Sequence, residues 1–519
     1  MKIKNITIKN FRSITECDFC FNDLLALVGE NNNGKSNIID AIEMLLKNNK
    51  VNNEYDFKDR NKTIEIEAIF DDLTDFEKEK ISAYLDDGNP LRLKKDFVFV
   101  EKDNGLPDSK STLYYFKEDE WKKTPAQNPF SGGILPEFYK VPAVRELKEE
   151  TKIATTTYFG KFLDLLFDSD DYDFTNLDNI LDQINTELKR EDENAPLIKG
   201  AKEIEAIMCE QFKDCCLKFE IDTPKRKSLI SQMEIFADDG CHTPLSSKGH
   251  GTQRAFIFSI LLLYAQKLNN KLKNIDGKDK KDIIIAIEEP EVYLHPHQQR
   301  IIYKLFKKLI GAEAEQIQII YTTHSSFMIN IEDYKYLGLV TKDSVEEGTK
   351  VTQCIEDIFE SDDKKEFKMA CQFDPERNEL FFADKIILCE GDTEKYSLPI
   401  IFEKLGINLI DKRISVIECG SKNSIPLFQK VLNKFNGKEK KFNYYVFYDN
   451  DNGNGKNQEI DDLMEDINNR FVFQDDLESH FSLTGLNKDK AYNARKQLLD
   501  KLEGDFPEDI KTFIQNNFS

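Results

Sequence analysis

The chain has 519 residues, of which 40% are hydrophobic and 32% are charged, and this balance excludes a disordered or fibrous protein. No run approaches the roughly 18 consecutive apolar residues of a membrane span, and residues 1–5 lack a signal-peptide core. We therefore expect a cytoplasmic protein with no membrane partner and with free thiols at its ten cysteines. The net charge of −23 disfavours tight non-specific binding to duplex DNA without excluding DNA cleavage.

An apolar strand, a glycine-containing loop and a helix follow one another near the start of the chain. The apolar run 24–28 leads into the loop 29–36 (GENNNGKS), and apolar residues at helical spacing come next. This is the context of a phosphate-binding loop, in which backbone N–H groups and a helix N-terminus meet the phosphates of ATP. We expect Lys35 to contact the β- and γ-phosphates and Ser36 to bind magnesium. The predicted nucleotide-binding residues of the loop are Gly29, Asn31, Asn32, Asn33, Gly34, Lys35 and Ser36.

A second buried strand ends in two glutamates. Residues 283–287 are all isoleucine or alanine, as expected of a parallel strand covered on both faces. A carboxylate at such a strand end can hold the magnesium of a nucleotide, and its neighbour can orient or deprotonate the attacking water. We assign the first role to Glu288 and the second to Glu289. The next apolar strand, 316–323, ends at His324, which is placed to sense a γ-phosphate.

A serine- and glycine-rich turn at 246–254 precedes an apolar helix over 255–264, and a turn of this kind can grip a phosphate. These parts, in this order, resemble the ATP-binding cassette (ABC) superfamily and specifically its soluble SMC-like branch. The resemblance implies that Ser247 and Gly249 close over a nucleotide held by another subunit, and therefore at least a homodimer. Arg12 resembles an arginine that contacts nucleotide in this branch.

Helical patterns over 162–188 and 199–212 predict a helical insertion between the two halves of the ATPase. No heptad pattern is long enough for the coiled-coil arm of an SMC protein.

Carboxylates follow several strands in the last third of the chain. The strand 385–389 leads to Glu390, with Glu394 expected in the first turn of the following helix, and the strand 444–448 ends at Asp449 and Asp451. Ligands gather outside the C-terminal edge of parallel sheets, where clustered carboxylates are tolerable only with bound cations. The pattern therefore predicts a divalent metal site.

This spacing resembles the topoisomerase–primase (TOPRIM) fold in its nuclease-type form. An SMC-like ATPase followed by such a module resembles the OLD (overcoming lysogenization defect) family of ATP-dependent nucleases, which includes the large subunit of Gabija-type phage-defence systems. The resemblance implies two Mg²⁺ or Mn²⁺ ions, with Glu478 as a later metal ligand and a basic residue beyond it. That residue could be Lys490, our first choice, or Lys496. The implied metal ligands of this site are Glu390, Glu394, Asp449, Asp451 and Glu478, and the predicted catalytic residues of both sites are Glu289, His324, Glu390, Asp449, Asp451 and Lys490.

The predicted fold class is α/β, with an ABC-type ATPase head, a helical insertion and a C-terminal TOPRIM domain built on a doubly wound parallel sheet. The expected boundaries are 1–150 for the N-terminal ATPase lobe, 151–230 for the insertion and dimerisation, 231–375 for the C-terminal lobe, and 376–519 for the nuclease domain.

The predicted function is an ATP-regulated, metal-dependent endonuclease that cleaves DNA, and family resemblance implies anti-phage defence. Two alternatives stay open: an ATP-driven sensor or scaffold acting through a protein partner, and a TOPRIM nuclease acting on RNA. The expected partners are DNA, further copies of the chain as a dimer or tetramer, and a protein or nucleic-acid partner of a defence system, of helicase or reverse-transcriptase type.

Overall fold

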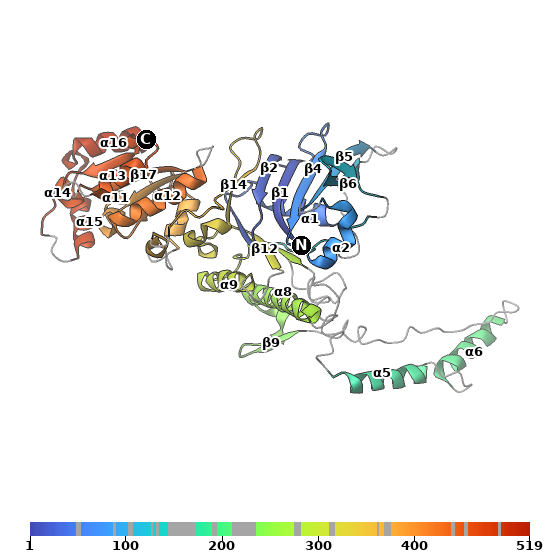
Figure 1. Cartoon of the computed structure of the whole chain (residues 1–519). Helices are drawn as coiled ribbons and strands as arrows, with labels where there is room; N and C mark the ends of the chain where they lie inside the picture. Colours follow the sequence, from blue (N-terminus) through green and yellow to red (C-terminus); the bar gives the residue numbers. More distant parts are fainter. Residues whose placement is uncertain are drawn as a thin grey trace. The chain divides into compact units, whose positions relative to one another are not determined.

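The computed structural model divides the chain into two compact units, one formed by Met1–Ala143 with Lys281–Ser519 and the other by Val144–Lys280. Segments on both sides of the second unit thus fold together (Figure 1). The structure describes residues 1–47, 53–86, 90–101, 107–125, 128–130, 134–143, 173–188, 195–209, 235–273, 282–310, 317–360, 363–367, 375–436, 442–450, 455–485 and 489–518.

An antiparallel sheet forms the first layer of the first unit, with strand order β2-β1-β4-β5-β6-β7. Its strands are β1 (Lys2–Phe11), β2 (Ile14–Cys20), β4 (Ile64–Asp71), β5 (Leu91–Glu101), β6 (Pro107–Lys117) and β7 (Glu120–Lys123). Burial alternates strictly along β4, because one face of the sheet lies on the core and the other faces outward.

A mostly parallel sheet forms a second layer, with strand order β14-β13-β3-β12-β11-β8. Its strands are β3 (Leu24–Val28), β8 (Glu137–Val141), β11 (Ile283–Glu288), β12 (Ile317–Thr323), β13 (Leu337–Thr341) and β14 (Lys350–Gln353). Only β14 runs antiparallel to its neighbour among these described strands. The strands β3 and β12 are buried along their whole length. In β3 this matches a continuous apolar run of the sequence, whereas β12 also buries Gln318, Thr322 and Thr323.

The helix α1 (Lys35–Leu46) lies between the two sheets, in contact with β1 and β4 on one side and with β8 and β12 on the other. Its C-terminal end is closed by a buried lysine of β5. Lys95 Nζ donates hydrogen bonds to the carbonyl oxygens of Met44 (2.8 Å) and Lys47 (2.7 Å). Since the last carbonyls of a helix have no partner within it, this lysine acts as a C-terminal cap.

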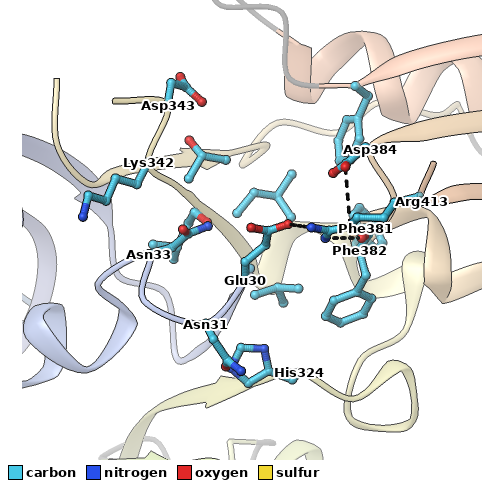
Figure 2. A pocket seen from close by; sticks show the side chains of 17 residues that line it. Glu30, Asn31, Asn33, His324, Lys342, Asp343, Phe381, Phe382, Asp384 and Arg413 are labelled. Carbon is cyan, nitrogen blue, oxygen red and sulfur yellow. Dashed lines mark hydrogen bonds and ion pairs between the residues drawn. The ribbon is translucent and has the colours of Figure 1, made fainter. Parts of the chain in front are cut away.

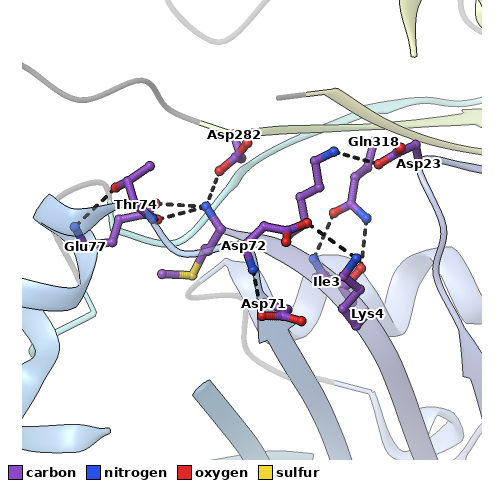
Figure 3. A network of polar contacts seen from close by, with 11 residues as sticks. Ile3, Lys4, Asp23, Asp71, Asp72, Thr74, Glu77, Asp282 and Gln318 are labelled. Carbon is purple, nitrogen blue, oxygen red and sulfur yellow. Dashed lines mark hydrogen bonds and ion pairs between the residues drawn. The ribbon is translucent and has the colours of Figure 1, made fainter. Parts of the chain in front are cut away.

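Polar contacts also join the layers (Figure 3). The buried side chain of Gln318, on β12, accepts a hydrogen bond from Ile3 N (2.9 Å) and donates one to Ile3 O (2.8 Å), so the two sheets are held in a fixed register. The α-amino group of Met1 is buried against the carboxylates of Glu77 and Asp282.

A second parallel sheet, with strand order β16-β15-β17-β18, forms the C-terminal part of the first unit. Its strands are β15 (Lys385–Cys389), β16 (Ile414–Glu418), β17 (Asn443–Asp449) and β18 (Arg470–Phe473). The accompanying helices are α11 (Asp392–Lys404), α12 (Ile425–Asn436), α13 (Gly455–Asp462), α14 (Leu477–His480), α15 (Lys490–Asp500) and α16 (Glu508–Phe518). Helix α11 packs on α15 and β16, and α12 packs on α13.

Further helices and 3₁₀ turns connect these layers. They are α2 (Asp75–Ile81), α9 (Pro296–Leu309) and the 3₁₀ turns η1 (Glu54–Asp56), η2 (Ser82–Tyr84), η4 (Ser326–Met328), η5 (Ile331–Tyr336), η6 (Arg377–Phe381), η7 (Lys422–Ser424), η8 (Ile467–Asn469) and η9 (Glu503–Asp505).

The described residues of the second unit form two helices, a small hairpin and a long helix. Its elements are α5 (Thr175–Leu188), α6 (Pro196–Cys209), β9 (Phe236–Asp238), β10 (His242–Pro244), η3 (Leu245–Ser247) and α8 (His250–Lys273). The helices α5 and α6 correspond to the predicted helical patterns, of which 162–172 and 210–212 lie outside the described residues. This unit also contains the serine- and glycine-rich turn at 246–254, which the sequence predicts to belong to the C-terminal ATPase lobe at 231–375. In the part of the chain that the structure describes, no helix has both the length and the apolar character of a membrane span.

Candidate nucleotide and metal sites

The phosphate loop runs from the end of β3 to the start of α1 and depends on two glycines. Gly29 and Gly34 have positive φ angles of 156° and 96°. A Cβ on Gly29 would collide with the carbonyl oxygen of Val340, and one on Gly34 with the hydroxyl of Thr349. Larger residues are therefore excluded by space as well as by backbone conformation. Thr349 also donates a hydrogen bond to the carbonyl of Asn33 (2.7 Å), which braces the loop.

Lys35 is folded back onto this loop. Its Nζ donates to the carbonyl oxygens of Gly29 (2.9 Å) and Glu30 (2.8 Å), and the residue is only 6% exposed. Burial lowers the pKa of Lys35 to about 8, against the opposing attraction of Glu289. Ser36 follows at the exposed start of α1, and Asn31 and Asn32 are also exposed in the loop, with Asn32 at a φ of 67°.

The acidic pair lies at the end of β11, beside the end of the neighbouring strand β12. Glu288 is paired across the sheet with Thr322, and its carboxylate lies 3.5 Å from Lys140 Nζ. Glu289 adopts a left-handed backbone with a φ of 44°. Its N–H is held by the carbonyl and the hydroxyl of Thr322, each at 3.1 Å. A left-handed glutamate is sparsely populated and is typical of a constrained functional residue.

His324 completes this group. Its Nε2 lies 3.7 Å from Glu289 Oε1, and its backbone N–H donates to Glu291 Oε1 (2.7 Å). Burial lowers the pKa of His324, and the nearby charge of Lys35 acts in the same direction. The structure thus brings Lys35, Glu289 and His324 together, although they are far apart in the sequence.

Arg12 lies beside the first turns of α1. Its Nε donates to Asp56 Oδ1 (2.7 Å), and its guanidinium donates to Asn37 Oδ1 (3.2 Å) and pairs with Asp40. The predicted contact of Arg12 with nucleotide stays a prediction.

Ser247 and Gly249 are exposed at the end of η3 and just before α8. A Cβ at Gly249 would meet no atom within 4 Å, so internal packing of the described residues gives no reason for a glycine there. Both residues belong to the second unit, and their action on another subunit's nucleotide stays a prediction.

The predicted metal ligands come from the C-terminal ends of parallel strands. Glu390 directly follows β15, Glu394 is in the first turn of α11, Asp449 is the last residue of β17, and Glu478 is in α14 after β18. Asp451 lies outside the described residues. Glu394 and Glu478 are each only 5% exposed, which is rare for carboxylates unless they are paired or bind a cation.

The electrostatics of these carboxylates fit a cation. Burial raises the pKa of Asp449 to about 8, and repulsion by Glu394 and Glu390 adds to the effect. Burial also raises the pKa of Glu394 to about 7. Among the described residues, Asp449 Oδ1 and Glu478 Oε2 are buried oxygens without a hydrogen-bond donor. Carboxylate oxygens are the ligands that Mg²⁺ and Mn²⁺ prefer.

The side chains do not yet form a coordination sphere. Within the described ranges, no three His, Cys, Asp or Glu side chains are arranged to hold a metal ion. Because like charges repel when no cation lies between them, a site of this composition needs side-chain adjustment on metal binding.

Of the two candidate basic residues, Lys490 lies at this edge of the sheet. It is the first residue of α15 and places Nζ 2.7 Å from Glu478 Oε1, whereas Lys496 is exposed further along the same helix.

A second lysine at this edge, Lys422, was missed by the sequence reasoning. It is 4% exposed and donates to the backbone carbonyl of Asp449, and its position just after the turn at Gly420 is the signal that could have revealed it.

Comparisons with known families match both halves of the chain. A family described as "AAA ATPase domain" matches residues 1–329, and one described as "Overcoming lysogenization defect protein-like, TOPRIM domain" matches residues 381–451. The predicted α/β fold class, an ABC-type ATPase followed by a TOPRIM sheet, is confirmed.

Several relatives align with this chain over most of their length. The chain is 26% identical to the Old nuclease of Escherichia phage P2, covering 83% of this chain and 75% of that protein. It is 23% identical to the OLD nuclease of Thermus scotoductus, covering 99% and 98%, and 23% identical to the endonuclease GajA of Bacillus cereus strain VD045, covering 98% and 82%. The AAA ATPase match spans more than half of the chain, so the chain belongs to that family, and with its TOPRIM domain it is a member of the OLD family of ATPase-linked nucleases.

Proposed function

We propose that this protein is an ATP-regulated, divalent-metal-dependent endonuclease that cleaves DNA in defence against phage. The observation that carries the proposal is the group of buried carboxylates at one edge of the TOPRIM sheet, where burial raises the pKa values of Asp449 and Glu394. The names of the relatives from phage P2, Thermus and Bacillus support the nuclease activity.

In the nucleotide site, Lys35 exchanges its carbonyl partners for the phosphates of ATP, because hydrogen bonds to an anionic oxygen are stronger. Ser36 and Glu288 hold the magnesium ion of the nucleotide. Glu289 orients the attacking water as the base, and His324, 3.7 Å from it, senses the γ-phosphate.

In the nuclease site, Glu390, Asp449, Asp451, Glu394 and Glu478 would hold two divalent ions. Such ions would supply a nucleophile at neutral pH and stabilise the leaving oxygen. Lys490, 2.7 Å from Glu478, would neutralise charge that develops on the phosphate during cleavage.

We further propose that the ATPase works as a homodimer or a larger assembly. The exposed positions of Ser247 and Gly249 leave both residues available to a nucleotide bound by another copy. A protein or nucleic-acid partner from a defence system would act on this assembly.

The test is a cleavage assay on supercoiled plasmid, linear DNA and structured RNA, with Mg²⁺ or Mn²⁺ and with or without ATP. The parent is compared with Lys35→Ala, Glu289→Gln and Asp449→Ala, and the exposed Asp411→Asn is the matched control. We expect DNA cleavage that Asp449→Ala abolishes and Asp411→Asn preserves. Cleavage by Asp449→Ala at the parent's rate would refute the metal site.

The acidic composition favours one alternative, an ATP-driven sensor that acts through a protein partner, because a net charge of −23 opposes non-specific DNA binding. Turnover of ATP without cleavage of any nucleic acid would support that alternative. Cleavage of RNA alone would change the substrate and keep the metal site.

A further inference from the structure

A direct contact joins the phosphate loop to the nuclease domain. The guanidinium of Arg413, in the turn before β16, makes an ion pair with the carboxylate of Glu30, the second residue of the phosphate loop (Figure 2). Both residues line a cavity of about 630 Å³, and Asn31 and His324 of the nucleotide site line the same cavity. The pair therefore lies at the border between the two catalytic parts of the chain.

On the nuclease side, Arg413 is fixed to the start of the sheet. Its Nε lies 3.4 Å from Asp384 Oδ2, and its carbonyl accepts a hydrogen bond from Asp384 N (3.0 Å). Lys385 and Ile414 are paired neighbours at the N-terminal ends of β15 and β16. The other end of β15 leads to Glu390, roughly 16 Å away along a rigid strand. The strand β15 therefore links the surroundings of Arg413 to the edge that carries the metal ligands.

On the ATPase side, the contact depends on the backbone of the phosphate loop. The carbonyl of Glu30 is held by Lys35 Nζ, at 2.8 Å. Bound phosphates would draw on the same ammonium group, so the hydrogen bond that fixes the backbone of Glu30 is weakened when Lys35 turns toward them. The cavity beside the pair leaves room for the loop to move.

We propose that Arg413 is a positioning residue that ties the nuclease domain to the phosphate loop while no nucleotide is bound, and that nucleotide binding loosens this tie. This inference rests on the proposed function and names a route for its ATP control. Arg413 and Glu30 are 47% and 50% exposed, so the pair is worth about a two- to fivefold change in an equilibrium constant. A contact of this modest strength can open when nucleotide binds and form again when nucleotide leaves.

The test is a double-mutant cycle in the full chain, with Arg413→Gln, Glu30→Gln and the double variant. The neighbouring exposed Lys412→Gln is the matched control. The first readout is the dissociation constant of a fluorescent ATP analogue, and the second is the ratio of DNA cleavage rates with and without ATP. Because coupling is reciprocal, we expect Arg413→Gln to tighten analogue binding about two- to fivefold and to bring the cleavage ratio closer to one.

In the Glu30→Gln background, the same Arg413→Gln change should have no effect on either readout, and Lys412→Gln should match the parent throughout. A shift that persists without Glu30, that is absent in the parent background, or that Lys412→Gln reproduces would overturn the proposal. Thermal unfolding checks that each variant is folded. Arg413→Lys, which keeps the charge and loses the planar fork, replaces Arg413→Gln if that variant does not fold, and a smaller shift of the same sign is then expected.

The two proposals fail separately. If the parent cleaves no nucleic acid, the proposed function fails, whereas the cycle of analogue dissociation constants still decides whether Arg413 and Glu30 are coupled to nucleotide binding.

Discussion

Glu289 shows how one residue can be prepared for catalysis by its backbone. Its left-handed conformation is unfavourable for a residue with a Cβ, and Thr322 holds it there by accepting the Glu289 N–H with both the carbonyl and the hydroxyl oxygen. The same conformation places the carboxylate 3.7 Å from His324. A neighbouring buried hydroxyl thus controls where the proposed base points.

This arrangement leads to a first prediction, for Thr322→Val. The substitution keeps the shape of a fully buried side chain and removes one hydrogen bond to Glu289, so the kcat for ATP hydrolysis should fall about three- to tenfold. The KM for ATP should change little, because the phosphate loop is untouched. Steady-state ATPase assays measure both, with Thr352→Val on the edge strand β14 as the control. An unchanged kcat would show that the hydroxyl does not position Glu289.

A second prediction concerns Asp449. Because burial raises the pKa of Asp449 to about 8, folding at pH 7 without metal has to protonate this carboxyl. Asparagine is already neutral, so Asp449→Asn should unfold about 2–4 °C above the parent in chelator at pH 7. Mn²⁺ should raise the unfolding temperature of the parent and leave that of the variant unchanged, because metal binding stabilises only the state that binds it. Scanning fluorimetry with and without Mn²⁺ measures both shifts. An equal rise in both proteins would place the ion elsewhere.

At the scale of elements, continuous apolar runs predicted the buried strands β3 and β11, because a strand covered on both faces has apolar side chains at successive positions. The strand β12 was predicted from its isoleucines, although Gln318, Thr322 and Thr323 are polar and buried. The antiparallel strands β5 to β7 were not predicted. In β5, Leu91, Leu93 and Phe97 lie on the buried face, but Lys95 interrupts this face, where it caps a distant helix. Local periodicity carries no information about such a partner.

The candidate sites likewise contain residues that the sequence predicts and residues that it does not. The phosphate loop and the strand-end carboxylates could be predicted, since each motif lies on a few consecutive residues beside a recognisable strand. Lys422 and Arg413 could not, because their importance comes from contacts with Asp449 and Glu30, which are distant in the sequence.

Lys95 gives a third prediction, at this scale. Burial lowers its pKa from 10.5 to about 8, so between pH 8 and 10.5 the folded state holds fewer protons than the unfolded state. The cost of burying the charged lysine is present below pH 8 and is relieved as the pH rises. The free energy of unfolding should therefore gain up to about 1.4 kcal/mol per pH unit from this residue.

Guanidinium unfolding of the parent and of Lys95→Met at pH 7.5, 8.5 and 9.5 measures that gain. The difference in stability, parent minus variant, should increase with pH. Parallel pH profiles would mean that the lysine is charged inside the folded protein across the whole range.

At the scale of the whole molecule, the predicted trans action of Ser247 gives a fourth prediction. Lys35→Ala lacks the nucleotide grip and Ser247→Arg blocks the turn, so each variant alone should have almost no ATPase activity. After mixing in equal amounts and exchange of subunits, half of the dimers are mixed and each has one intact site, which gives about one quarter of the parent activity. Activity that stays at the level of the separate variants would mean that the turn acts within its own chain. Mass photometry of the mixture confirms that dimers are present.

The parallel pairing of β8 with β11 has a consequence for how this chain can vary. The chain leaves the sheet after Val141, at the C-terminal end of β8, and returns at Ile283, the N-terminal end of β11. Because the strands are parallel, Ile283 lies beside Glu137 and Ile287 beside Val141, so the two points are at opposite ends of the strand pair. Any connecting segment must therefore run the length of the pair, roughly 16 Å, and that span is the minimum for a substitute linker. Beyond this minimum, added length costs little entropy. Natural relatives can thus exchange or enlarge the segment between these strands while the register of the ATPase sheet stays the same.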